Sequence, residues 1–89
     1  MELNISKRAA WRLSQRQAAG ARLTLLRGEV HRLNPLPAGI FVISGCAWVS
    51  WNGQDILLNQ GEGIQFSPGG YDPLISVLGT AALTIELLA

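Results

Sequence analysis

Few residues in this 89-residue chain are of a type that could bind a metal ion or move protons. The stretch GEGIQFSPGGYD, residues 61–72, places Glu62 and Asp72 on either side of a Pro-x-Gly turn, but no histidine follows. First-row divalent metals favour imidazole together with carboxylate ligands, and the single histidine, His31, lies far upstream. We therefore expect no metal ion held by these side chains and no cofactor.

Two carboxylates and one thiol remain as candidates for catalysis. Asp55 and Glu62 could divide the roles of general acid and general base. However, Asp55 follows a hairpin turn and Glu62 lies in a Gly-Glu-Gly turn, where short polar side chains commonly bond to backbone amides. Cys46 would act as a nucleophile only if a neighbouring base ionised it, and its apolar neighbours predict a buried thiol instead. We expect no catalytic residue.

Two tryptophans in the stretch CAWVSW, residues 46–51, have opposite parity, so in a strand one faces inward and the other outward. We expect Trp48 to fill the core. Trp51 adjoins the Asn52-Gly53 turn, and we expect it outside, either as an interface anchor, a role in which Trp is enriched, or in a structural role.

Other aromatic residues complete the candidates. Tyr71, in the loop PGGYDP, would lie at one end of the fold, either packing its turn or contacting a ligand. The candidate ligand-binding residues are Trp48, Glu62 and Tyr71. The candidate interface residues are Trp11, Phe41 and Trp51.

The elements that must position these residues are short strands. From residue 22 onward apolar residues alternate or form short β-branched runs, separated by Gly, Pro and Asn turns, which is typical of an all-β sandwich or barrel. Asn52-Gly53 predicts a tight hairpin, because a type I′ turn needs positive φ at both central positions. We predict about eight short antiparallel strands in one domain over residues 22–89.

Residues 1–21 form a basic arm in this interpretation. Ile5, Ala9 and Leu13 would share one face of a helix over residues 4–19, which Gly20 could end. An extended arm and a short first strand remain as alternatives.

Charge is unevenly distributed. The first 32 residues hold all seven basic residues and two acidic ones, a net charge of +5, whereas residues 33–89 hold four acidic residues and no basic one. A helix would align Arg8, Arg12 and Arg16, a stripe that could bind a polyanion. Docking of the arm on the acidic body of its own or a neighbouring subunit is the simpler interpretation. A solvated face is the second alternative, and nucleic-acid binding is the least favoured one.

Composition favours an oligomer. Charged residues make up 15% of the chain and hydrophobic residues 48%, against an average of about 25% charged. Residues 40–43 are apolar on both strand faces, so the arm, a second subunit or both must cover the outer face. We expect a homodimer.

The lone cysteine, the absence of a long apolar run and the lack of an apolar signal segment predict a cytoplasmic protein without a membrane span.

The segments LLRGEVHRL, GIFVISGCAWVSWNGQDILLNQGEGIQF and ISVLGTAALTIE resemble a family of small bacterial proteins, the domain of unknown function DUF2917. The resemblance covers roughly residues 25–87. It implies a single-domain, cupin-like β-barrel and no particular reaction. We therefore expect a non-enzymatic, metal-free barrel that acts as an oligomerising or protein-interaction module. A barrel that binds or senses a small molecule is the alternative, and a metal-dependent cupin enzyme is a weaker one.

Overall fold

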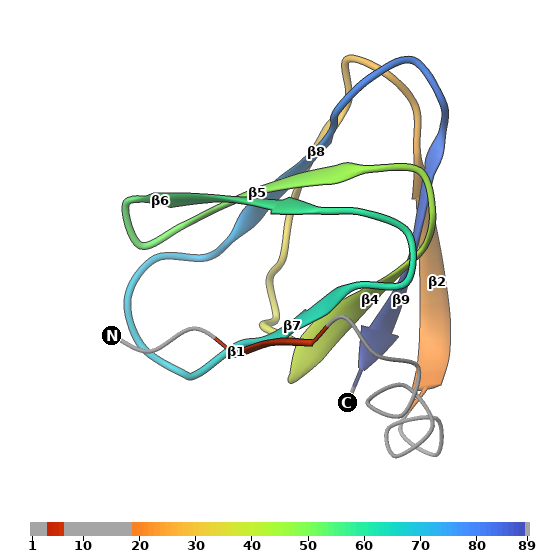
Figure 1. Cartoon of the computed structure of the whole chain (residues 1–89). Helices are drawn as coiled ribbons and strands as arrows, with labels where there is room; N and C mark the ends of the chain where they lie inside the picture. The colour runs from red at the N-terminus through yellow and green to blue at the C-terminus, as the bar shows by residue number, and fades with distance from the viewer. Residues whose placement is uncertain (1–3, 7–18, 89) are drawn as a thin grey trace.

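The computed structural model describes residues 4–6 and 19–88, and in these ranges every regular element is a β-strand (Figure 1). Nine short strands are present there. All of their pairings are antiparallel. In chain order the strands are β1 (Asn4–Ser6), β2 (Ala19–Leu25), β3 (Val30–Arg32), β4 (Gly39–Ser44), β5 (Ala47–Trp51), β6 (Gln54–Leu58), β7 (Gly63–Gln65), β8 (Leu74–Val77) and β9 (Leu83–Leu88).

The strands form two sheets that pack against each other as a sandwich. One sheet has five strands in the order β1-β7-β4-β9-β2, and the other has four in the order β3-β8-β5-β6. In Figure 1, β5 and β6 cross above β7 and β4. Side chains from both sheets make one apolar core; its buried members are Leu25, Leu33, Ile40, Val42, Ala47, Val49, Trp51, Ile56, Leu58, Ile64, Phe66, Ile75, Leu83 and Ile85. The all-β prediction is confirmed.

The hairpin between β5 and β6 agrees with its sequence signal. Asn52 and Gly53 have φ values of 49° and 76°, the left-handed conformation that a two-residue hairpin of type I′ requires. Trp51 pairs with Gln54 across the turn, and the register continues to Ala47 opposite Leu58. The turn therefore determines which residues of β5 and β6 share a face.

The predicted arm is partly a strand. Asn4–Ser6 pairs with β7, and β2 begins at Ala19 and pairs with β9. A helix that starts at residue 4 is therefore wrong for its first turn, because these residues complete the edge of a sheet. The remainder of that prediction, including the candidate interface residue Trp11, lies outside the described residues.

The assignment of the two tryptophans is the reverse of the prediction. Trp51 is 2% exposed and packs edge-on against Phe66, with ring centroids 5.0 Å apart at 80°, whereas Trp48 is 41% exposed. Trp51 shares its face of β5 with Ala47 and Val49, which are fully buried. Trp48 shares its face with the polar Ser50. The more apolar face of β5 is therefore the one that packs inward, and the closeness of Trp51 to the turn does not expose it.

No helix in the described part of the chain is long and apolar enough to cross a membrane.

Removal of the Trp51 ring should test its place in the core. We predict that Trp51→Ala lowers the free energy of unfolding by about 3–5 kcal/mol, because it leaves a large cavity. Trp51→Phe should cost only about 1 kcal/mol from lost apolar area, since it keeps a ring beside Phe66 and removes an indole N–H that is buried and meets no acceptor among the described residues.

Urea unfolding followed by circular dichroism measures these changes. Tyr71→Ala is the control, since Tyr71 is 86% exposed and such a surface change should stay within about 0.5 kcal/mol. Equal losses for Trp51→Ala and Tyr71→Ala would contradict the assignment of Trp51 to the core.

Candidate functional site

The outer face of the four-stranded sheet is the most distinctive surface of the described chain. Strand register places its outward side chains in two rows. The first row runs from β3 through β8 and β5 to β6 as Val30, Ser76, Trp48 and Leu57. The second row runs across the same strands as Arg32, Leu74, Ser50 and Asp55.

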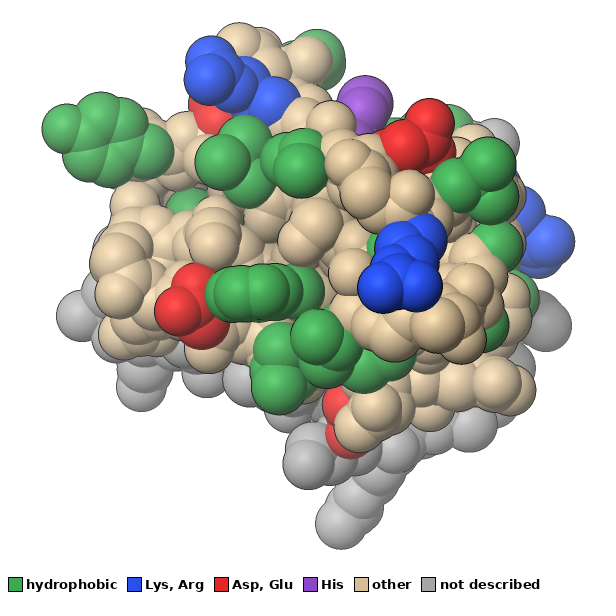
Figure 2. Space-filling view, turned by 90° about the horizontal axis from the view of Figure 1, so that it is seen from above, with side chains coloured by type: hydrophobic (Ala, Val, Ile, Leu, Met, Phe, Trp, Pro, Cys, Tyr) green, Lys and Arg blue, Asp and Glu red, His purple; other side chains and the backbone are tan. Residues whose placement is uncertain are grey.

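Large apolar side chains on this outer face are open to solvent. Val30 is 64% exposed, Leu57 is 55% exposed, and Trp48 and Leu74 are also exposed. Figure 2 looks onto this side of the molecule and shows several hydrophobic side chains gathered there. Single exposed apolar residues are normal, but a contiguous group commonly marks a contact surface.

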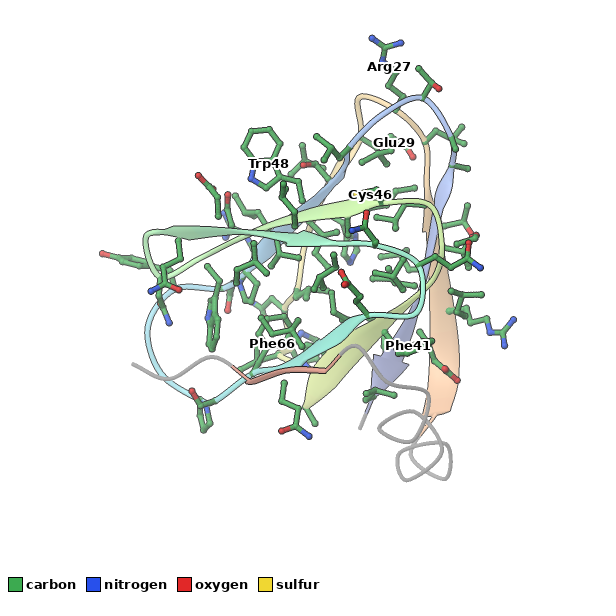
Figure 3. The ribbon with its side chains drawn as sticks, in the orientation of Figure 1. Arg27, Glu29, Phe41, Cys46, Trp48 and Phe66 are labelled. Atoms are coloured by element: carbon green, nitrogen blue, oxygen red, sulfur yellow. The ribbon has the colours of Figure 1, made fainter. Side chains whose placement is uncertain are left out.

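A hydrogen-bond cluster holds Trp48 in one orientation. Its indole Nε1 donates to Asp55 Oδ1 over 3.1 Å, and the Ser50 hydroxyl donates to the same oxygen over 3.0 Å. Figure 3 shows the ring rising from β5 on the side away from β4 and β7. A side chain that is already held in place loses less conformational entropy when a partner binds. Asp55 therefore acts here as a support for an aromatic residue.

The outer face of the five-stranded sheet differs, because its large apolar residues Phe41 and Leu88 are buried. Phe41 is paired with Glu86 across β4 and β9, and both are 6% exposed. Leu88 on β9 is buried as well. Phe41, predicted as an interface residue, thus presents little surface to a second molecule, and Trp51, the other such candidate with a described position, lies in the core.

The three candidate ligand-binding residues lie on separate parts of the fold. Trp48 stands on the outer face of β5, Glu62 belongs to the turn between β6 and β7, and Tyr71 lies in the loop before β8. An open groove of about 330 Å³ is lined by Tyr71 together with Arg32, Gly70, Asp72 and Leu74. Neither Trp48 nor Glu62 lines it, so no common site gathers the three.

Glu62 has a structural role that the turn pattern predicted. Its carboxylate accepts a hydrogen bond from the backbone N–H of Asn59 over 2.7 Å, and its own N–H donates to the Asn59 carbonyl over 3.0 Å. The side chain and backbone of Glu62 therefore close the turn of residues 59–62 from both ends.

The turn of residues 26–29 repeats this arrangement. The backbone N–H of Leu26 donates to Glu29 Oε1 over 2.7 Å, and the Glu29 N–H donates to the Leu26 carbonyl. The third residue of each turn is a glycine with positive φ, 91° at Gly28 and 86° at Gly61, a conformation that glycine adopts at little cost. The shared pattern x-x-Gly-Glu is visible in the sequence as LRGE and NQGE, and it explains two of the acidic residues without catalysis.

The thiol and the imidazole do not form a reactive pair in this fold. Cys46 is half-buried and donates to Asn59 Oδ1 over 3.3 Å, so the prediction of a buried apolar thiol is wrong. His31 is half-buried on β3, opposite Ile75. Within the described residues no group of three or more His, Cys, Asp or Glu side chains is placed to hold a metal ion.

Comparison of the chain with protein-family models, curated proteins and solved structures found no match. The family membership suggested by the residues thus stays a prediction.

The x-x-Gly-Glu turns should contribute measurably to stability. We predict that Glu29→Ala lowers the free energy of unfolding by about 1 kcal/mol, because the Leu26 N–H loses its side-chain acceptor. Glu29→Gln should retain part of this contribution, since its amide oxygen also accepts a hydrogen bond. Thermal unfolding of both variants measures the difference, and equal stability of the Ala variant and the original chain would contradict the role of Glu29.

Proposed function

We propose that this protein is a non-enzymatic interaction module that forms a homodimer through the outer face of its four-stranded sheet. The observation that supports this most strongly is the group of exposed apolar side chains on that face, with Trp48 held upright among them by Asp55. A rigid tryptophan surrounded by aliphatic residues is a common centre of protein–protein contacts.

Composition and burial support the same proposal. The chain has a low share of charged residues, and the five-stranded sheet already has Phe41 and Leu88 of its outer face buried within one chain. Of the two outer sheet surfaces, the face that contains Trp48 would therefore gain more free energy if a partner covered it. Each square ångström of apolar surface removed from water contributes about 25 cal/mol.

The packing between the sheets favours this function over that of a barrel with a small molecule inside. Ile40, Leu58, Ile64 and Ile85 are completely buried between the sheets along with the Trp51 ring. Side chains occupy the interior that such a ligand would need. The groove beside Tyr71 is open and outside that interior.

We also propose that the chain belongs with the cupin-like barrels of DUF2917 and acts in a bacterial cytoplasm. The short antiparallel strands, the Asn52-Gly53 hairpin and the turn that ends in Glu62 support the family assignment, because they lie in the segments that carry the resemblance. The free thiol of Cys46 is in keeping with a reducing compartment.

The oligomeric state tests the proposal. We expect sedimentation equilibrium at micromolar concentration to give the mass of two chains, and Trp48→Ser to shift the protein to the mass of one. Thr24→Ala is the control, because Thr24 lies on β2 of the other sheet, where it bonds Thr84. Circular dichroism checks that each variant is folded. A monomeric original chain, or a folded Trp48→Ser variant that dimerises like it, would refute the proposal.

A further inference from the structure

The two rows of the outer face carry opposite charges at opposite edges. Arg32 stands on β3 at one edge and Asp55 on β6 at the other, in the same row. Three strand spacings separate them, about 14 Å. Arg32 makes no ion pair with any described residue within the usual 4 Å limit. The hydrogen bonds from Trp48 and Ser50 to Asp55 both end on Oδ1, so neither of them uses Oδ2.

We propose that the second copy packs on this face about a two-fold axis that runs parallel to the strands, between β5 and β8. The inference rests on the proposed homodimer and specifies its geometry. A rotation about this axis places β3 of one subunit over β6 of the other and keeps each row facing itself. Arg32 then lies over Asp55 of the partner subunit, and the symmetry produces this ion pair twice.

Side-chain sizes fit the same arrangement. In the first row the rotation sets Trp48 over Ser76 of the partner subunit and Val30 over Leu57 of the partner subunit. In the second row it sets Leu74 over Ser50 of the partner subunit. Facing sheets lie about 10 Å apart with interdigitated side chains, so large residues opposite serines can pack without a clash. The outer face is therefore complementary to itself in both shape and charge.

Charge separates this arrangement from the other simple one. An axis perpendicular to the strands would also pack the sheets face to face, but it would place β3 over β3 and β6 over β6. Both Arg32 side chains would then lie at one edge of the interface and both Asp55 side chains at the other, so neither charge would face one of opposite sign. Like charges gathered at one edge of an interface weaken binding, so the axis parallel to the strands is favoured.

Charge reversal tests the geometry. The variants Arg32→Glu and Asp55→Arg should each replace two attractive pairs with two repulsive ones, and we expect the dimer dissociation constant to rise roughly 10- to 100-fold. When the two variants are mixed, every facing pair is again of opposite sign, so a one-to-one heterodimer should form more tightly than either variant pairs with itself. Its affinity should stay below that of the original chain, because the Asp55→Arg subunit no longer holds its Trp48. Asp55→Asn, which keeps an acceptor for Trp48 and removes only charge, should have a smaller effect.

Native mass spectrometry of the separate and mixed variants, made distinguishable by isotope labelling, measures these outcomes. If the original chain is monomeric, both this inference and the proposed homodimer fail. If it is a dimer that Trp48→Ser dissociates, but the two reversal variants dimerise as well as the original chain or do not recover affinity on mixing, the homodimer stands and the proposed axis is wrong.

Discussion

The burial of one face of β5 is the constraint on which the other features depend. Ala47, Val49 and Trp51 point into the core, and the tight turn at Asn52-Gly53 locks β6 in register against them. Because side chains alternate along a strand, this register leaves Trp48 and Ser50 no place except outside. The exposure of Trp48 thus follows directly from the burial of Trp51. Because β5 lies between β6 and β8, its outward residues are at the centre of the outer face.

Polar groups on that face hold an aromatic residue in one orientation. Asp55 accepts from both the Trp48 indole and the Ser50 hydroxyl, and Glu62 and Glu29 close turns. Each of these carboxylates thereby accepts a hydrogen bond from a residue three to seven positions away in the sequence. Such short-range bonds give a small sandwich well-defined turns, which matters in a chain of this size because its single core is thin.

Homodimerisation would complete the burial that one chain begins. A small domain buries a smaller fraction of its surface than a large one. Here the five-stranded sheet has Phe41 and Leu88 buried on its outer face, while the other sheet exposes Val30, Trp48 and Leu57. Arg32 at one edge of the exposed face and Asp55 at the other make the two edges opposite in charge. A second copy is therefore expected to bind in one orientation more tightly than in others. In this scheme the buried apolar area provides most of the dimer's affinity, and the charges determine how the two subunits are oriented.

The sequence by itself determined the all-β class, the Asn52-Gly53 hairpin and the structural role of Glu62, because these depend on alternation and turn chemistry over a few neighbouring residues. It also determined that Trp48 and Trp51 lie on opposite faces. Only the tertiary structure decided which of them is inside, since that choice depends on the sum of burial over β5, β6 and β8, which the chain brings together from distant positions. The alignment of Arg32 with Asp55 in one row likewise depends on three successive strand pairings, β3 with β8, β8 with β5 and β5 with β6. No local sequence pattern encodes such a long-range register.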